Sequence, residues 1–208
     1  MGTVLAMIKH LVLGLGAAAI LVSSCASVVP LVKGGMARVS GAASSVPIAA
    51  RAPNGAPQIL VTLRSRGVKF PMGQLDTDGG VSVWAANDAS QVALRNGVLI
   101  SSRGFGMDLM SADVPSIAEL VGGAAQHTRT HFYLDGSDTP IRITYTCTSE
   151  AAPEANPSGA AHHIIENCQG DAGTIQNEYW LDSAMNVIKS HQWLSQGVGY
   201  ADFGPNAG

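Results

Sequence analysis

The sequence predicts a mainly β protein, in which an antiparallel meander sheet curls into a barrel- or sandwich-like domain with one short helix. Three observations lead to this fold class. Valine, isoleucine and leucine fill short runs rather than long amphipathic stripes, several runs alternate apolar and polar residues, and turn-forming residues separate them. Short runs with a period of two residues are typical of strands that bury one face.

The first strands are expected from Gln58 onward. The run Ile59–Leu63 is apolar and is bounded by Pro57 and a turn at Arg64–Gly67. Val81–Trp84 alternates apolar and polar residues, as a half-buried strand does.

The clearest local signal is a hairpin. Val92–Arg95 and Val98–Ser101 are apolar runs that flank the pair Asn96-Gly97. Asn-Gly favours a type I′ turn, because both central residues of that turn need a positive φ. The sequence therefore predicts two antiparallel strands joined at these residues.

A short helix is expected at Ser116–Val121, since Pro115 precedes it and Gly122 follows it. Its residues Ile117, Leu120 and Val121 share one face, which we expect to pack on the sheet. Asp113 is a candidate for the cap of this helix.

The second half of the chain predicts further antiparallel strands. A turn at Asp135–Asp138 and a surface loop at Ser149–Gly159 interrupt them, and the tail from Ala201 is expected to fray. The expected strands are Thr128–Leu134, Ile141–Cys147, His162–Cys168, Thr174–Leu181 and Val187–Leu194.

The N-terminal segment indicates export and lipid attachment. Leu11–Val22 is apolar throughout, follows Lys9, and is too short to cross a bilayer. It ends in Val22-Ser23-Ser24-Cys25, an aliphatic residue and two small residues before a cysteine. This is the pattern of a bacterial lipoprotein signal, in which Cys25 accepts a diacylglycerol and acyl chains hold the protein on a membrane. An ordinary secreted protein or an uncleaved anchor is the alternative.

The domain organisation follows from this segment. Residues 1–24 are interpreted as a signal peptide, 25–57 as a lipidated tether, and 58–203 as the β-rich domain. The tether is rich in Ala, Ser, Gly, Val and Pro. A short helix at Ser27–Val39 that packs on the domain is the alternative. Ala26, where an aspartate would favour the inner membrane, favours the outer membrane instead.

The remaining cysteines, Cys147 and Cys168, form an even pair. In an exported protein such a pair predicts a disulfide, although a thiol nucleophile or a metal ligand stays open for either residue. The formal net charge of −3, with only 13% charged residues, gives no basic footprint for nucleic acid.

Catalytic and metal-binding motifs are missing from the sequence. It contains no G-x-S-x-G, no H-E-x-x-H and no P-loop. In a strand, His162 and His163 point to opposite faces, while His127 and His131 share a face about 13 Å apart, too far for one metal ion. We therefore expect no catalytic residues, no metal and no cofactor.

Two kinds of side chain remain as candidates for sugar chemistry. The carboxylate pairs Asp108 with Asp113 and Asp135 with Asp138 suit turns better than the acid and base of a glycosidase. Among the tryptophans, Trp180 and Trp193 are candidates for stacking on sugar rings. If the strand is regular, Tyr179 and Trp180 face opposite ways and one of them is exposed.

An ordered set of segments carries a family likeness. The set comprises Arg95–Leu99, Ser102–Asp113, Leu134–Gly136, Tyr145–Cys147, Cys168, Asn177–Asp182 and Gln192–Tyr200. Together with the lipoprotein signal, this chain resembles the YjbF family of lipoproteins from about Gln58 to Tyr200. The resemblance implies a mainly antiparallel β fold and an outer-membrane lipoprotein encoded with exopolysaccharide or capsule export genes, with no established catalytic residues.

The resemblance leads to a functional hypothesis: a non-catalytic lipoprotein that assists polysaccharide production or export, with capsule-export proteins or the polysaccharide as partners. A hydrolase that trims polysaccharide or cell wall and a purely structural envelope lipoprotein are the alternatives. Within the family-like part, Arg103, Asp108 and Asp113 surround a Gly-rich turn. They form either a salt-bridged structural corner or a contact site for glycan or an export partner.

Overall fold

The computed structural model describes residues 53–123, 126–152 and 159–206. The predicted signal peptide, Cys25 and the tether as far as residue 52 lie outside these residues. The described part contains the strands β1 (Gln58–Leu63), β2 (Val68–Asp78), β3 (Val81–Ala85), β4 (Gln91–Arg95), β5 (Val98–Arg103), β6 (Ser111–Asp113), β7 (His127–Leu134), β8 (Pro140–Ala151), β9 (His162–Gly170), β10 (Gly173–Leu181), β11 (Val187–Ser195) and β12 (Gly199–Pro205). The 3₁₀ turn η2 (Arg64–Arg66) and the helix α1 (Ile117–Gly122) complete it.

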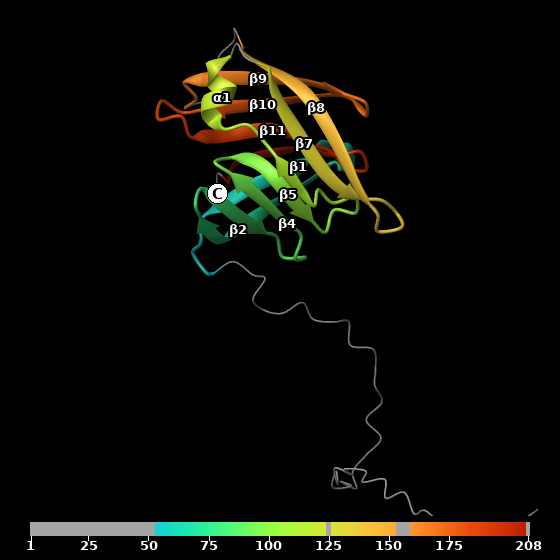
Figure 1. Cartoon of the computed structure of the whole chain (residues 1–208). Coiled ribbons are helices and arrows are strands. Elements are labelled where there is room, and N and C mark those ends of the chain that lie inside the picture. Colours follow the sequence, from blue (N-terminus) through green and yellow to red (C-terminus); the bar gives the residue numbers. More distant parts are fainter. Residues whose placement is uncertain (1–52, 124–125, 153–158, 207–208) are drawn as a thin grey trace, which may run out of the picture. The chain divides into compact units, whose positions relative to one another are not determined.

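The twelve strands form one antiparallel sheet in the order β5-β4-β3-β2-β1-β12-β11-β10-β9-β8-β7-β6. Strands that follow each other in the chain pair, except β5 and β6, which are the two edges of the sheet. β1 also pairs with β12 and so joins the two ends of the domain. The outer strands β5 and β6 approach each other where the Ser102 N–H donates to the carbonyl of Leu109 at 2.8 Å. The sheet is thus nearly closed into a barrel (Figure 1), which confirms the predicted fold class.

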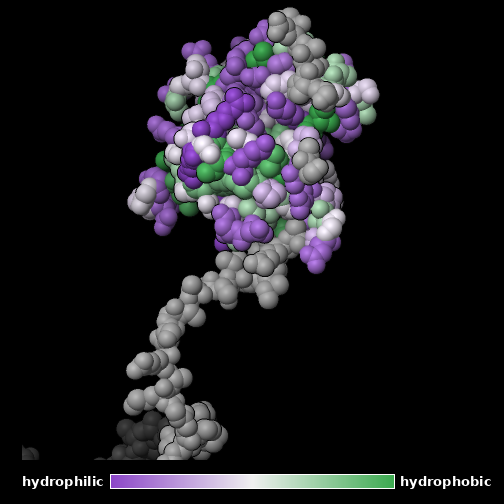
Figure 2. Space-filling view, turned by 180° about the vertical axis from the view of Figure 1, so that it is seen from behind, coloured by the Kyte–Doolittle hydropathy of each residue, from purple (hydrophilic) through white to green (hydrophobic). Residues whose placement is uncertain are grey.

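Apolar side chains fill the inside of this barrel. Val61, Met72, Leu109 and Leu194 are fully buried, and they belong to a cluster that draws on both halves of the sheet. Hydrophilic residues cover much of the face seen in Figure 2, with smaller apolar areas between them. The period-two pattern of the strands therefore separates core from surface as predicted.

The predicted hairpin is confirmed. β4 and β5 pair, and the turn residues Asn96 and Gly97 have φ values of 48° and 86°. Gly97 also lies against β11, because a Cβ atom at this position would come within 2.4 Å of the Val187 Cβ. The glycine is therefore needed for both the turn and the packing.

The strand β2 was not predicted, because Val68–Asp78 contains Pro71 and lacks clear alternation. Pro71 pairs with Leu60 of β1, whereas the pairing of β2 with β3 begins only at Gly73. Proline has no N–H to donate, and Pro71 is tolerated because β3 does not pair with β2 at this position.

The prediction that the tail frays from Ala201 is wrong. β12 runs on to Pro205, and Ala201 and Phe203 are 0% and 3% exposed in the core. β12 pairs with β1 on one side and with β11 on the other. The Gly- and Pro-containing sequence concealed this strand, which connects the two ends of the sheet.

The helix is confirmed, but its cap is not Asp113. Ser116 is the N-cap and forms a capping box with Glu119, whereas Asp113 lies in β6 opposite Thr130. A serine followed three residues later by glutamate is the better capping signal. As expected, Ile117, Leu120 and Val121 pack on the sheet. Among the described residues, no helix is long and apolar enough to cross a membrane.

Candidate functional site

Cys147 and Cys168 form the disulfide that their even number predicted. They lie directly opposite each other on β8 and β9, with their Cα atoms 4.0 Å apart. Both are buried on the inner face of the sheet. The bond therefore joins two neighbouring strands, as expected from the hairpin arrangement.

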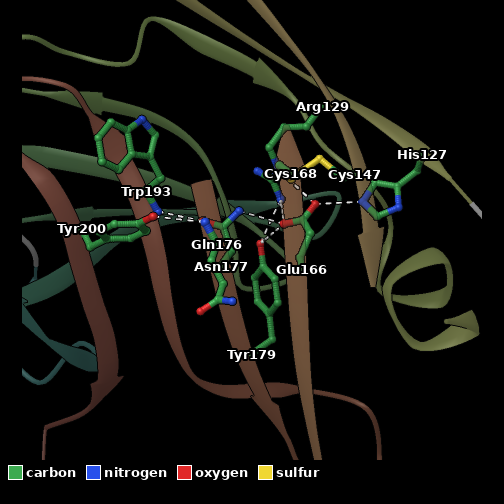
Figure 3. Close-up of a disulfide and its surroundings, with 10 residues drawn as sticks. All are labelled: His127, Arg129, Cys147, Glu166, Cys168, Gln176, Asn177, Tyr179, Trp193 and Tyr200. Carbon is green, nitrogen blue, oxygen red and sulfur yellow. Dashed lines mark hydrogen bonds and ion pairs between the residues drawn. A yellow bond between two sulfur atoms is a disulfide. The ribbon is translucent and has the colours of Figure 1, made fainter. Parts of the chain in front are cut away.

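A buried ion pair lies beside this disulfide (Figure 3). Arg129 of β7 donates from Nε to Glu166 Oε1 at 3.2 Å and from Nη2 to Oε2 at 2.8 Å. The two residues are 2% and 0% exposed. Such a two-point contact fits the planar guanidinium to the carboxylate and partly offsets the cost of burying both charges.

Three further side chains complete the cluster around Glu166. Asn177 Nδ2 and the Tyr179 hydroxyl donate to Oε2 at 2.8 and 3.1 Å, and His127 Nε2 lies 2.9 Å from Oε1. Burial raises the pKa of Glu166, but the Arg129 charge and the hydrogen bonds with His127, Arg129 and Asn177 outweigh burial and hold that pKa at about 2. Glu166 is therefore ionised and accepts hydrogen bonds in a structural role. We call Glu166, Arg129, His127, Asn177 and Tyr179 together the Glu166 cluster.

Together with the neighbouring Cys147, the Glu166 cluster offers three possible metal-ligand atoms. One atom each of His127, Cys147 and Glu166 lies within 4.8 Å of the others. However, the Cys147 sulfur is bonded to Cys168 and the Glu166 carboxylate is bound by Arg129. Neither group offers a free anionic ligand in this state, and zinc and similar ions require deprotonated ligands.

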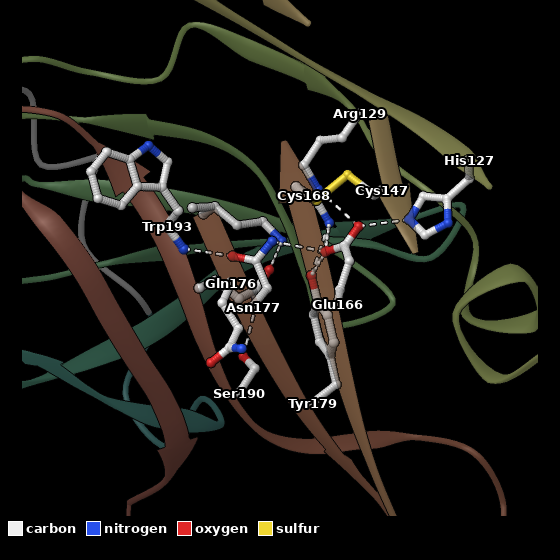
Figure 4. Close-up of polar contacts among 12 residues, drawn as sticks. His127, Arg129, Cys147, Glu166, Cys168, Gln176, Asn177, Tyr179, Ser190 and Trp193 are labelled. Atoms are coloured by element: carbon white, nitrogen blue, oxygen red, sulfur yellow. Dashed lines mark hydrogen bonds and ion pairs between the residues drawn. A yellow bond between two sulfur atoms is a disulfide. The ribbon is translucent and has the colours of Figure 1, made fainter. Parts of the chain in front are cut away.

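Asn177 extends the Glu166 cluster from β10 to Trp193 on β11 (Figure 4). Backbone pairing of these strands covers only Glu178–Leu181 on β10. Beyond it, the Trp193 N–H donates to Asn177 Oδ1 at 2.8 Å, and the Gln176 N–H donates to the Tyr200 hydroxyl at 3.1 Å. Side chains thus replace the ladder bonds that the separated strands lack.

The sequence predicts that either Tyr179 or Trp180 is exposed, but both are buried in the structure. Tyr179 points inward and is 0% exposed, and Trp180 points outward but is only 9% exposed. His163 from β9 stacks on the Trp180 ring at 4.5 Å, and Lys189 Nζ from β11 lies 4.4 Å from its centroid. Two neighbouring side chains therefore cover the indole of Trp180.

Trp193 is half-buried and lies beside other aromatic rings. Its ring meets that of Tyr200 edge-on at 5.0 Å, and Tyr200 stacks on His191 at 4.6 Å. These three side chains form an aromatic group where the second half of β11 pairs with the beginning of β12. As a contact for sugar rings, Trp193 stays a prediction and is better placed for it than Trp180.

The segment of Arg103, Asp108 and Asp113 is not a salt-bridged corner, because no ion pair joins these three described residues. Asp108 instead accepts hydrogen bonds from the N–H groups of Gly104 and Phe105 at 2.7 and 2.9 Å and so closes the Gly-rich turn. Arg103 and Asp113 are exposed at the ends of β5 and β6. Their role as contacts stays a prediction.

A polar groove of about 460 Å³ lies on the outer face of β8, β9 and β10. We call it the outer amide groove, and it is lined by Thr146, Thr148, Asn167, Gln169, Gln176 and Tyr200 among others. Sequence reasoning missed it, although these polar residues alternate with buried ones along each strand. The missing information was the register, which places Thr148 opposite Asn167 and Asn167 opposite Gln176.

A structural disulfide such as that of Cys147 and Cys168 is typical of a protein outside the reducing cytosol. The family model of the group 4 capsule polysaccharide lipoproteins (gfcB, YjbF) matches residues 51–203, and the chain belongs to this family. The family is one of lipoproteins, which implies a lipid anchor in the cell envelope.

One solved structure supports the fold. The hypothetical lipoprotein YmcC from Escherichia coli K12 matches with a TM-score of 0.59 at 17% sequence identity, over 72% of this chain and 83% of that one. No curated protein sequence matches this chain.

Proposed function

We propose that this protein assists the production or export of an extracellular or capsular polysaccharide from the cell envelope, without cleaving the polymer. The observation that carries the proposal is the family match over residues 51–203. The outer amide groove supports it, because hydroxyl and carboxamide side chains suit a ligand rich in hydroxyl groups.

The carboxyl groups support a role without catalysis. Glycoside hydrolysis uses a carboxylic acid whose pKa is raised, together with a second carboxylate. Among the described residues, every carboxyl group with a clear shift has its pKa lowered, and these are Asp88, Glu119, Asp135, Glu166, Asp182 and Asp202. None of these six groups has the raised pKa of a glycosidase acid, and the hydrolase stays the alternative proposal.

The proposal includes an anchor on the periplasmic face of the outer membrane through a lipid on Cys25. The sequence Val22-Ser23-Ser24-Cys25 supports this attachment site, and the family name supports a lipid anchor. In the variant Cys25→Ala, the protein is expected to leave the membrane fraction, whereas Cys147→Ala serves as a matched cysteine control that stays there. Membrane attachment of Cys25→Ala would refute this site.

The function is tested by deleting the gene and measuring surface and secreted polysaccharide, with and without the gene restored. We expect a loss of polymer that the restored gene repairs. The chain length of the polymer that remains is measured in the same samples. Unchanged output after a clean deletion would refute the proposal, and longer polymer with unchanged output would favour the hydrolase.

A further inference from the structure

The outer amide groove presents a surface of neutral, two-way hydrogen-bonding groups. Thr146, Thr148, Asn167, Gln169 and Gln176 point outward from three adjacent strands, and no lysine or arginine of the described residues lines the groove. Hydroxyl and carboxamide groups each donate and accept hydrogen bonds. A matching ligand must also donate and accept hydrogen bonds, and it needs no net charge. Sugar hydroxyl groups meet both conditions.

Part of the groove is already ordered by its own contacts. Gln176 Nε2 donates to Asn167 Oδ1 at 2.7 Å, and Asn167 Nδ2 donates to Glu150 Oε1 at 3.2 Å. These bonds link β8, β9 and β10 and hold the carboxamides of Asn167 and Gln176 in place. Preordered side chains lose less conformational entropy when a ligand binds.

Other groups in the groove remain open to a ligand. The side chains of Thr146, Thr148 and Gln169 are exposed and have no hydrogen bond to another described residue. They lie on neighbouring strands, with Thr146 opposite Gln169. Strand neighbours are about 5 Å apart, so successive groups can meet successive hydroxyls of an extended chain.

The groove has an aromatic wall and a rigid floor. Tyr200 lines one side, and its hydroxyl accepts a hydrogen bond from the Gln176 N–H. Trp193 and His191 pack on its ring. These contacts hold Tyr200 in place, so it forms a fixed aromatic edge of the groove. Beneath the floor, the disulfide of Cys168 links β9 to β8.

We propose that the outer amide groove binds a short, uncharged stretch of a polysaccharide chain that crosses β8, β9 and β10 on the outside of the barrel. This proposal rests on the proposed function and deepens it by naming the ligand class and its site. It assigns binding to residues other than Arg103, Asp108, Asp113 and Trp180, none of which lines this groove.

The test uses the full chain purified in detergent and oligosaccharides made by partial hydrolysis of the polysaccharide that the producing strain secretes. Binding is measured by calorimetric titration. Thr148→Ala and Gln169→Ala are each expected to weaken binding about 3- to 10-fold, the effect of losing one hydrogen bond. Thr144→Ala is the matched control, because Thr144 is exposed on β8 but does not line the groove.

The outcomes separate the two proposals. If the oligosaccharides do not bind, or if both groove variants bind like Thr144→Ala, the groove proposal is overturned even where the deletion strain has lost its polymer. If binding depends on the groove but the deletion strain exports normally, the site stands and the export function fails. A photo-crosslinker at position 169 that captures a protein instead of the oligosaccharide would overturn the site as a glycan groove.

Discussion

Replacement of Glu166 by glutamine is expected to destabilise the protein strongly, although the two side chains have nearly the same shape. In the folded state Glu166 Oε2 accepts hydrogen bonds from Arg129, Asn177 and Tyr179, and Oε1 accepts one from Arg129 Nε. A glutamine amide placed at either oxygen position would direct N–H groups at donors. The Arg129 guanidinium, 2% exposed, would also lose its counter-charge.

The expected cost follows from this loss. Breaking a buried ion pair by removing one partner costs about 3–5 kcal/mol, because an unpaired charge stays buried. Since a domain of this size has about 5–15 kcal/mol of stability in total, the variant should lose a large part of it. The measurement is urea unfolding at pH 7 under non-reducing conditions, followed by tryptophan fluorescence.

Two controls make the result interpretable. Glu178→Gln makes the same change on the neighbouring strand β10, where the carboxylate is 27% exposed and contacts His163, so it should cost less than about 1 kcal/mol. The double variant Glu166→Gln with Arg129→Met should recover part of the loss, since no charge is left unpaired. A cost for Glu166→Gln no larger than that for Glu178→Gln, or strictly additive effects in the double variant, would refute the reasoning.

The pH dependence gives an independent check on the same residue. The folded pKa of Glu166 is about 2, below its usual value of 4.5, so the unfolded chain binds more protons between these values. The stability from Glu166 is therefore present above pH 4.5 and is lost as the pH falls towards 2, by about 3 kcal/mol in total. Glu166→Gln should remove this contribution to the acid slope, and an unchanged slope would contradict the assignment.

Three further outcomes are expected. The double variant Cys147→Ala/Cys168→Ala should lose about 3 kcal/mol of stability, from the chain-entropy estimate for a sequence separation of 21 residues; an unchanged urea midpoint would argue against this. Burial lowers the pKa of His131 to about 3 from 6.5, so the unfolded state binds more protons below pH 6.5. Lowering the pH from 7 to 5 should therefore cost about 2 kcal/mol through His131, and His131→Asn should abolish that share of the slope, as urea titrations at the two pH values would reveal. Gly97→Ala should lower the melting temperature, because φ is 86° there and the new Cβ meets Val187, whereas the neighbouring Asn96→Gly keeps the turn and should have little effect.

Local chemistry accounts for the parts of the fold that the sequence predicted. The turn at Asn96-Gly97 and the helix of Leu120 depend on residues a few positions apart, so their signals lie in one short window. β2 was missed because Pro71 and weak alternation conceal it, although its partners β1 and β3 are its neighbours in the chain. β12 was missed because its partner β1 lies at the other end of the domain. Val61 of β1 pairs with Phe203, and this distant pairing, together with that to β11, makes a strand of a tail that carries glycine and proline.

The site residues depend still more on register. Arg129, Glu166 and Tyr179 lie on β7, β9 and β10, and nothing in their spacing along the chain indicates that they meet. Sequence reasoning placed Trp180 among the sugar contacts, yet the neighbours that cover it, His163 and Lys189, come from the two flanking strands. A residue in a sheet is exposed or covered according to its cross-strand neighbours, which the sequence does not name.

The Glu166 cluster and the outer amide groove are two faces of the same strands. On β10 the inward Asn177 binds Glu166 and the Trp193 backbone, while the adjacent Gln176 points outward into the groove. On β9 the inward Cys168 forms the disulfide between two outward carboxamides, Asn167 and Gln169. The charges buried inside the barrel thus hold in place the strands that carry the groove. Glu166→Gln should therefore weaken oligosaccharide binding as well as stability, although Glu166 is fully buried. Unchanged affinity in the calorimetric titration would contradict this coupling.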